Sequence, residues 1–220
     1  MSITLVYGFA SSILEVLLQS NHPPGCVYVI EDNHVTRMQE NGFYSKYKFI
    51  SSDELPQIQS GVKQVYLGVA STASKRALAY ASLSKVQHFN TPLLLHPLSV
   101  TSKTAELSEG MFADSFVSIQ HRSMVGKYAY INAHSHLGHN SRVGKFSVLG
   151  GSVSLSGGSC IGDYVTIGSG VIVGNNVKIG DRSIVVAGSV VLEDIPPDSI
   201  ARGNPSRIIC SSLPVVRIPE

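Results

Sequence analysis

The chain has no tryptophan, only three cysteines and few charged residues for its length. Of its 220 residues, 15% are charged, and the formal net charge is +2. The basic residues are scattered, so we expect no broad nucleic-acid-binding surface. Cys26, Cys160 and Cys210 lie far apart, give an odd count and form no CxxC motif. This usage favours reduced thiols, and therefore a cytoplasmic protein without a disulfide framework.

Long hydrophobic runs and a dinucleotide-binding fingerprint are also missing. No stretch of about 18 uncharged apolar residues is present, so no membrane insertion is expected. The apolar N-terminus has no basic region and carries Glu15, which argues against a signal peptide. Gly8 is followed by Phe-Ala-Ser-Ser, so the G-x-G-x-x-G pattern of an ordinary NAD site is absent.

The second half of the chain contains a strict six-residue repeat. A strand repeats every two residues and a helix every 3.6, so neither alone produces a period of six. Six is the period of a hexapeptide solenoid, a parallel β-helix. The repeat extends backwards to Leu107 through Val125, Ile119 and Ala113. Its unbroken aliphatic part consists of Ile131, Leu137, Val143, Leu149, Leu155, Ile161, Ile167, Val173, Ile179, Val185 and Val191.

The other positions of the hexad support a triangular coil. We call the aliphatic positions of this six-residue series the ladder positions. Four residues after most of them stands Ser, Ala or Val, which would fit near a corner of the core. The residue directly after the ladder position is often Gly, and we expect it to supply the backbone angles that corners require. Three hexads make a coil of 18 residues, so residues 107–192 hold nearly five coils. Such coils bury their faces only against their neighbours.

The first half alternates short apolar strands with helical segments. Strands are expected over residues 3–7, 26–30, 64–69 and 92–95, and helices over 13–19 and 72–83, with Thr72 or Ser71 as an N-cap. This alternation predicts a small parallel sheet of Rossmann type. Ligands of such sheets bind beyond the carboxyl ends of the strands. Residues 8–12, 31–33 and 70–72 would form that rim.

Two stretches, INAHSHLGHNSRVGKFSVLGG (131–151) and ARGNPSRII (201–209), carry a resemblance to a known family. They resemble the bacterial sialic acid O-acetyltransferases and bacillosamine-type sugar N-acetyltransferases. That family joins a small Rossmann-like domain to a left-handed parallel β-helix and uses acetyl-CoA to acetylate a sugar. The resemblance implies a sugar-nucleotide-binding domain over residues 1–92 and a β-helix acetyltransferase domain with a C-terminal tail over residues 93–220.

The resemblance also implies roles for individual residues. His139 matches the general base of the family. The following residue, usually acidic, is Asn140, which can orient the imidazole ring but cannot stabilise an imidazolium with a full charge. His134 flanks the site and could reach the substrate. The implied acetyl-CoA contacts are Val148, Ser169 and Ala187, and the implied substrate contacts in the N-terminal domain are Ser11, Ser12, Glu31, Asp32 and Ala70.

Acetyl transfer places modest demands on such a site. A thioester is already activated, so one base and one donor for the developing oxyanion suffice, and no metal is expected. A histidine base contributes about 10²–10⁴-fold. A backbone N–H near Gly150 or Gly151 could meet the oxyanion. His121 lies 18 residues before His139, and both should point outwards or towards a neighbouring subunit, since each follows a ladder residue by two.

The resemblance favours a homotrimer that N-acetylates a nucleotide-linked 4-amino-4,6-dideoxy sugar, in which the N-terminal domain of a neighbouring subunit presents the sugar. O-acetylation of a sialic- or legionaminic-type sugar is the alternative. A non-catalytic trimer that binds sugar nucleotides, or a zinc β-helix of the carbonic anhydrase kind, also stays open. Zinc is disfavoured because those enzymes add a histidine where this chain has VGKFSV (143–148), and they lack an N-terminal Rossmann-like domain.

Overall fold

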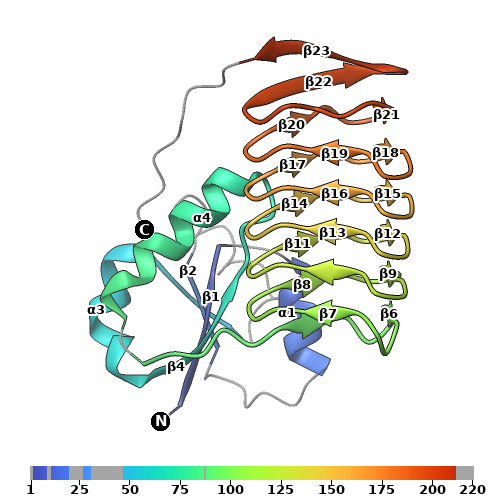
Figure 1. The fold of residues 1–220 in the computed structure, drawn as a ribbon. Coiled ribbons are helices and arrows are strands. Elements are labelled where there is room, and N and C mark those ends of the chain that lie inside the picture. Colours follow the sequence, from blue (N-terminus) through green and yellow to red (C-terminus); the bar gives the residue numbers. More distant parts are fainter. Residues whose placement is uncertain (1, 9–10, 20–26, 31–46, 87, 212–220) are drawn as a thin grey trace.

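In a computed structural model, two parts of different architecture stand side by side (Figure 1). The structure describes residues 2–8, 11–19, 27–30, 47–86 and 88–211, and of residues 11–12, 18–19 and 84–85 only the backbone. The first part is a small parallel sheet with helices, and the second is a tall stack of triangular coils. The predicted fold class is therefore confirmed.

The N-terminal sheet has four parallel strands in the order β3-β2-β1-β4. They are β1 (Ile3–Tyr7), β2 (Val27–Ile30), β3 (Lys48–Ile50) and β4 (Val62–Leu67). The described helices are α1 (Ser11–Gln19), α3 (Leu55–Ile58) and α4 (Ala73–Ala81), with short 3-10 turns η2 (Ser52–Glu54), η3 (Gln59–Gly61) and η4 (Ser82–Lys85).

Most of these elements follow the predicted segments with slightly shifted ends. Thr72 is the N-cap of α4, and its hydroxyl accepts a hydrogen bond from the Lys75 N–H at 3.3 Å. β3 escaped prediction because its three residues are too few to show a period. The strand expected over residues 92–95 is β5 (Leu94–Leu95), which belongs to the β-helix.

The order of the strands gives the N-terminal sheet a topological switch point. From β1 the chain moves to β2 and β3 on one side of β1, and then crosses to β4 on the other side. The reversal lies between β1 and β4. Open parallel sheets bind ligands beyond the carboxyl ends of the strands at such a switch point. The loops after Tyr7 and after Leu67 border it, and they are joined by a hydrogen bond from the Gly68 N–H to the Tyr7 carbonyl at 2.7 Å.

The β-helix has three faces of short parallel strands. The first face contains β5, β8 (Phe112–Ala113), β11 (Tyr130–Ile131), β14 (Val148–Leu149), β17 (Thr166–Ile167), β20 (Ile184–Val185), β22 (Ser199–Gly203) and the antiparallel β23 (Ser206–Ser211). The second face contains β6 (Val100–Thr101), β9 (Ser118–Ile119), β12 (His136–Leu137), β15 (Ser154–Leu155), β18 (Ile172–Val173) and β21 (Val190–Val191). The third face contains β7 (Glu106–Leu107), β10 (Met124–Val125), β13 (Arg142–Val143), β16 (Cys160–Ile161) and β19 (Lys178–Ile179).

The aliphatic ladder forms the core of this stack. From Ala113 to Val191 the ladder side chains are between 0% and 3% exposed. Each pairs with the ladder residue one coil away, as Ile131 does with Leu149. The solenoid begins two hexads before Leu107, because β5 and β6 already pair with β8 and β9. Thr101 occupies a ladder position there. Because it is polar, the aliphatic pattern that revealed the period does not continue through it.

The corners correct the role expected for glycine. The glycines that directly follow ladder positions, such as Gly144, have no positive φ. A Cβ at Gly144 would lie 2.3 Å from the carbonyl oxygen of Gly162, so these glycines permit close stacking of coils. Positive φ instead recurs every six residues at a different position of the hexad. That position is occupied by glycine in some coils, such as Gly158 (φ 72), and by other residues elsewhere, such as His134 (φ 61) and Asn140 (φ 57).

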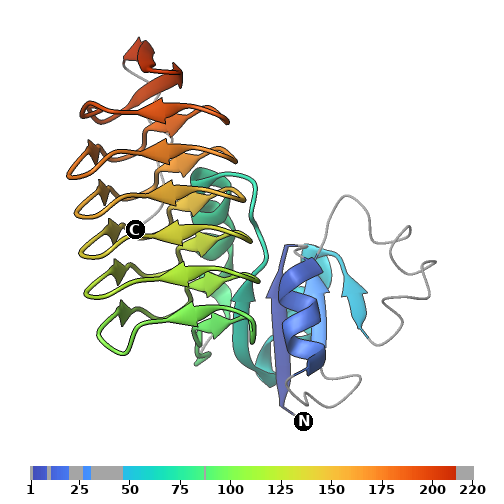
Figure 2. The ribbon, with the colours of Figure 1, turned by 90° about the vertical axis from the view of Figure 1, so that its right-hand side faces the viewer.

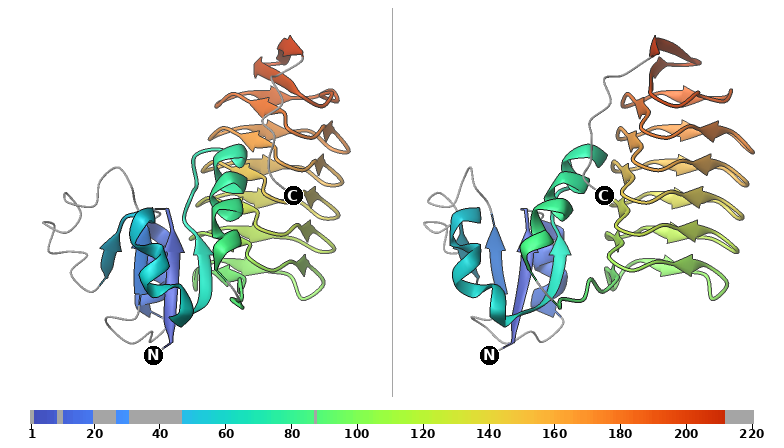
Figure 3. Two further views of the ribbon diagram at one scale, coloured as in Figure 1. Left: turned by 90° about the vertical axis from the view of Figure 1, so that its left-hand side faces the viewer. Right: turned by 60° about the vertical axis from the view of Figure 1, so that its left-hand side comes forward.

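The N-terminal domain covers the first face beside the lower coils, and α4 lies between its sheet and the β-helix (Figures 2 and 3). Phe112, Tyr130 and Val148 point outwards from the first face and are 2% exposed. They share one apolar cluster with side chains of β1, α1, β2 and β4, such as Val6 and Leu14. None of the described helices has the length and apolar character needed to cross a bilayer.

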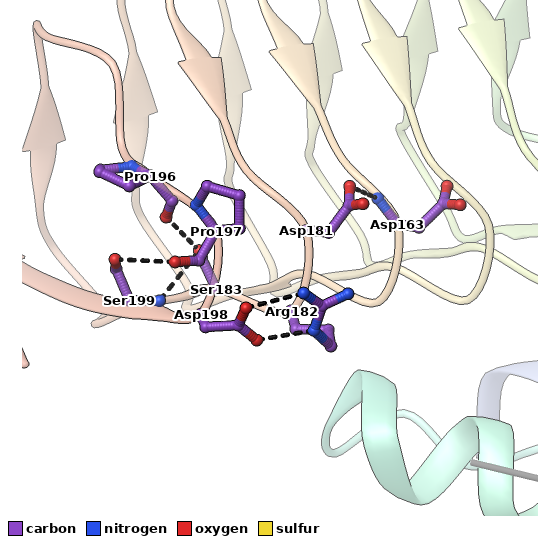
Figure 4. A network of polar contacts seen from close by, with 8 residues as sticks. All are labelled: Asp163, Asp181, Arg182, Ser183, Pro196, Pro197, Asp198 and Ser199. Carbon is purple, nitrogen blue, oxygen red and sulfur yellow. Dashed lines mark hydrogen bonds and ion pairs between the residues drawn. The ribbon is translucent and has the colours of Figure 1, made fainter. Parts of the chain in front are cut away.

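The upper end of the β-helix is closed by β22 and its antiparallel partner β23. Below it, the Ser183 hydroxyl donates to the Pro196 carbonyl at 2.8 Å and accepts from the Ser199 N–H at 3.2 Å (Figure 4). Arg182 forms two hydrogen bonds with the Asp198 carboxylate, at 2.6 and 2.7 Å. These bonds tie the last coil to the strand that caps it.

Candidate active site

The three faces meet at three corners, and the predicted site residues divide among them. Corner 1 joins the first face to the second and includes residues 133–134, 151–152, 169–170 and 187–188. Corner 2 joins the second face to the third and includes residues 121–122, 139–140 and 157–158. Corner 3 joins the third face to the first and includes residues 127–128, 145–146 and 163–164.

His139 is exposed at corner 2, as its place two residues after Leu137 predicts. Its backbone is held from both sides. The Gly158 N–H donates to the His139 carbonyl at 2.9 Å, and the Asn140 N–H donates to the His121 carbonyl at 2.9 Å. Its ring lies over Gly157, where a Cβ would come within 2.4 Å of Nε2. The backbone at His139 is therefore fixed and its imidazole is exposed. The position of the ring depends on the missing side chain of Gly157.

Asn140 occupies the corner position that takes positive φ, and its φ is 57°. Asparagine tolerates this left-handed conformation better than most residues. The same position of a higher coil is Asn176, with φ 60°. Backbone geometry thus accounts for asparagine at this point, and within the described part of the chain its side chain has no hydrogen-bond partner.

The other histidines of this region lie at corner 1, on the second face and directly below His139. His134 is exposed at corner 1, where its ring stacks on Phe116 with 4.9 Å between centroids and 18° between planes. His121 lies one coil below His139, and its Nδ1 is 2.8 Å from the Thr104 hydroxyl. No group of three His, Cys, Asp or Glu side chains in the described residues could hold a metal ion.

The predicted acetyl-CoA contacts do not form one group in a single chain. Ser169 and Ala187 are both exposed at corner 1, in successive coils joined by the Gly188 N–H bond to the Ser169 carbonyl at 2.9 Å. Val148 lies on the first face and is buried against the N-terminal domain. His139 is separated from Ser169 and Ala187 by the width of the second face.

The predicted substrate contacts are only partly described. Ala70 is half-buried in the loop after β4, next to the switch point. Ser11 and Ser12 begin α1 beyond the carboxyl end of β1, and their side chains are not described. Glu31 and Asp32 lie outside the described residues.

Arg76 is a feature that the sequence analysis missed. It is 0% exposed on α4, between the two domains. Burial lowers the pKa of its guanidinium to about 9, so it stays protonated near neutral pH. A signal was present: at helical spacing, Arg76 falls on the same stripe as Ala73, Ala77 and Tyr80, where a charge interrupts an apolar face.

The comparisons with known proteins agree with this architecture. Residues 158–193 match the family model described as bacterial transferase hexapeptide (six repeats). Perosamine N-acetyltransferase from Caulobacter crescentus, a histidine-to-asparagine variant in complex with CoA and GDP-perosamine, is 25% identical with a TM-score of 0.81. The match covers 94% of this chain and 97% of that one. No curated protein sequence matches the chain significantly.

Two further solved structures share the whole fold. The acetyltransferase domain of PglB from Neisseria gonorrhoeae, in complex with acetyl coenzyme A, is 19% identical with a TM-score of 0.81, and the match covers 95% of this chain and 100% of that one. WeeI from Acinetobacter baumannii is 22% identical with a TM-score of 0.78, again over 95% and 100%. The fold and the repeats are similar to those of hexapeptide-repeat transferases that carry an N-terminal Rossmann-like domain. The predicted resemblance to bacterial sugar acetyltransferases is confirmed.

Proposed function

We propose that this protein transfers an acetyl group from acetyl-CoA to the 4-amino group of a nucleotide-linked 4-amino-4,6-dideoxy sugar. One observation carries the proposal: both parts of the chain match at once, over 94% of its length, an enzyme that was solved with CoA and GDP-perosamine. A β-helix alone would leave the acceptor unexplained. The switch point between β1 and β4 is the place where a sheet of this topology suits a nucleotide.

His139 is the proposed general base. Its exposed imidazole takes the proton of the sugar amine as the nitrogen attacks the thioester carbon. The carbon–sulfur bond then breaks, and the CoA thiolate receives a proton. General-base catalysis of this kind contributes about 10²–10⁴-fold. In this scheme Asn140 is not required to polarise the ring, because the positive φ at this corner already accounts for an asparagine at this position.

The oxyanion donor is reassigned. Gly150 is unsuitable because its N–H already donates to the Ile167 carbonyl at 2.8 Å, and Gly151 lies at corner 1, across the second face from His139. Gly157 is adjacent to the His139 ring, and among the described residues its N–H has no acceptor. A preorganised N–H beside the base meets the geometric demand for oxyanion stabilisation. We therefore assign this role to the Gly157 N–H.

A homotrimer would assemble a complete site. Exposed apolar side chains gather on the second face and its two edges: Leu98, Val100, Phe116, Ile172, Val186 and Leu192. With this face turned towards a three-fold axis, corner 2 of one subunit would meet corner 1 of the next. His139 would then face the neighbour's Ser169 and Ala187. Closed cyclic symmetry is the usual arrangement of soluble oligomers.

The surface of corner 1 fits the thin acyl-carrying arm of CoA. Above His134 the corner residues are all small: Gly151, Ser152, Ser169, Gly170, Ala187 and Gly188. A Cβ built at Gly170 or Gly188 would meet nothing within 4 Å. The upper corner therefore leaves an open shelf along which an extended chain could lie, with Ser169 and Ala187 as its floor. Val148 has no place in this arrangement, because the N-terminal domain covers it.

The test is thiol release from acetyl-CoA with a set of nucleotide-linked amino sugars, GDP-perosamine among them. His139→Ala should lower kcat by about 10²–10⁴-fold, whereas His121→Ala, on the same corner one coil below, should retain activity. An unchanged rate in His139→Ala would contradict the assigned base. Turnover only with acceptors that offer a hydroxyl would move the assignment to O-acetylation.

A further inference from the structure

Arg76 is held by four backbone carbonyl oxygens. Two belong to the N-terminal domain: Nη1 donates to the carbonyl of Leu67 at 2.7 Å and to that of Val69 at 3.0 Å. Two belong to the β-helix: Nε donates to the carbonyl of Tyr128, and Nη2 donates to that of Gly110 at 3.5 Å. The guanidinium carbon also lies 5.2 Å from the centroid of the Tyr130 ring. One planar side chain thus fixes two domains to each other.

Packing alone does not explain a charge at this position. Removing a guanidinium from water is costly, and an apolar residue of similar volume often stabilises a buried site as well or better. The neighbouring positions on the same stripe are Ala73 and Ala77, both 1% exposed. The fork geometry of arginine, with five N–H donors in one plane, is what allows it to bridge several carbonyls at once.

The carbonyls that Arg76 binds in the N-terminal domain lie at the switch point. Leu67 ends β4, and Val69 stands in the loop that leads to α4. The same loop packs against Gly8 at the end of β1, where a Cβ would come within 2.6 Å of the Val69 side chain. The end of this loop is also tied to the β-helix, because the Ala73 N–H donates to the Thr166 hydroxyl at 3.0 Å.

We propose that Arg76 is a positioning residue for the acceptor: it holds the loop of residues 68–72, and with it the switch point at which we propose the nucleotide sugar binds, at a fixed place relative to the β-helix. The inference rests on the proposed function. Arg76 itself touches neither the reacting amine nor the thioester. Its influence passes through the Leu67 and Val69 carbonyls.

Three variants separate positioning from simple stabilisation. Arg76→Met removes all four hydrogen bonds while keeping an unbranched, buried side chain. Arg76→Lys keeps the charge but loses the fork. Tyr80→Phe is the matched control, since it removes the Tyr128–Tyr80 hydroxyl bond of 3.1 Å across the same interface and leaves the loop untouched.

The kinetic readout is a separation of Michaelis constants. In Arg76→Met, KM for GDP-perosamine or the best nucleotide amino sugar should rise at least about tenfold, while KM for acetyl-CoA stays within about twofold. Arg76→Lys should fall between Arg76→Met and the wild type, and Tyr80→Phe should match the wild type. If Arg76→Met has a lower melting temperature but both Michaelis constants are unchanged, Arg76 is only a structural residue and the proposal is overturned.

Hydrogen exchange on the whole chain provides a readout that needs no substrate. The amides of residues 68–72 should exchange at least about tenfold faster in Arg76→Met than in Tyr80→Phe. Equal exchange in the two variants would overturn the proposal. If the wild type released no thiol with any nucleotide amino sugar, the proposed function would fail instead, and exchange would still decide the role of Arg76. Should Arg76→Met not fold, Arg76→Lys carries the same comparison.

Discussion

At the scale of single residues, the proposed base is placed by the absence of a neighbouring side chain. The His139 ring occupies the space above Gly157, where a Cβ would lie 2.4 Å from Nε2 and 2.6 Å from Cε1. Gly157 has no positive φ, so an alanine fits its backbone. The conflict is therefore confined to the imidazole, which is free to turn away towards solvent.

We expect Gly157→Ala to fold normally and to lose activity. Displacing a catalytic group by about 1 Å can cost about 10²-fold in rate, and kcat should fall by that order while KM for acetyl-CoA changes little. Steady-state thiol release and a melting curve measure the two effects. The control is Gly174→Ala, one coil above and one position earlier in the hexad, where the nearest atom would be 3.3 Å away. Equal kcat in the two variants would mean that Gly157 does not place the ring.

The sequence predicted that His139 is exposed, but not that its ring packs over Gly157. The ladder predicts which way a side chain points, because every residue inherits its direction from the nearest ladder position. It also predicts that Gly157 lies one coil above His139, as His121 lies one coil below. The ladder does not predict that the ring folds upwards over Gly157. That depends on a side-chain rotamer and on local space, which no period encodes.

At the scale of elements, residues 18 apart in the β-helix stack in columns, one residue from each coil. The column at corner 3 ends in an ion pair. Arg182 of corner 3 meets Asp198 just before β22, as Figure 4 shows. Hydrogen bonding to Arg182 lowers the pKa of the Asp198 carboxyl below its usual value and raises that of Arg182. The pair joins the last regular coil to the strands that close the solenoid.

This pair predicts a pH dependence of stability. Because the folded-state pKa of Asp198 is the lower one, its contribution is fully present above the ordinary carboxyl pKa near 3.8 and is lost as the pH falls through the folded value. Partly exposed pairs contribute about 0.2–1 kcal/mol. Asp198→Asn, which suits the φ of 57°, should reduce the free energy of unfolding by that amount at pH 7 and by progressively less below pH 4. Urea denaturation at several pH values measures the difference, and a constant difference across this range would exclude the pair as its source.

Elements with a period were predictable and those without one were not. The strands of the β-helix follow from the ladder, and its first two hexads were missed only because Thr101, a polar residue, took a ladder position. β3 has no comparable signal. The glycines after ladder positions were correctly placed next to corners, but their function was misjudged, since their missing Cβ makes room for the coil above.

At the scale of the whole molecule, the docking of the two domains was the least predictable feature. It rests on Arg76 and on outward aromatic side chains such as Tyr130, and neither lies on a repeating pattern that specifies a partner. The aromatic column of corner 3 shows the same limit. Phe146 stacks on Tyr128 and Tyr164 with centroids 4.8 and 5.4 Å apart, and Tyr80 of α4 completes the contact with Tyr128 at 4.4 Å. Spacing predicts such a column, but only the fold identifies the helix that covers it.

The proposed trimer makes a prediction that a site within one chain does not. His139 lies at corner 2 and Ser169 at corner 1, so each complete site would combine corner 2 of one subunit with corner 1 of its neighbour. His139→Ala removes the base, and Ser169→Trp fills the shelf, where the exposed serine leaves room for a large side chain without disturbing the core. Each variant alone should be inactive.

Mixing the two variants by co-expression should restore activity. In a mixed trimer, an intact His139 from the Ser169→Trp chain can face an intact corner 1 from the His139→Ala chain. With random assembly about a quarter of the sites would be whole, so thiol release should recover towards about a quarter of the wild-type rate. The double variant His139→Ala/Ser169→Trp, mixed with either single variant, is the negative control for sites that lack one half. Sedimentation of the mixture confirms that the chains have assembled. Mixed trimers that remain inactive would place both halves of the site within one chain, and would remove the second face from its proposed position at the three-fold axis.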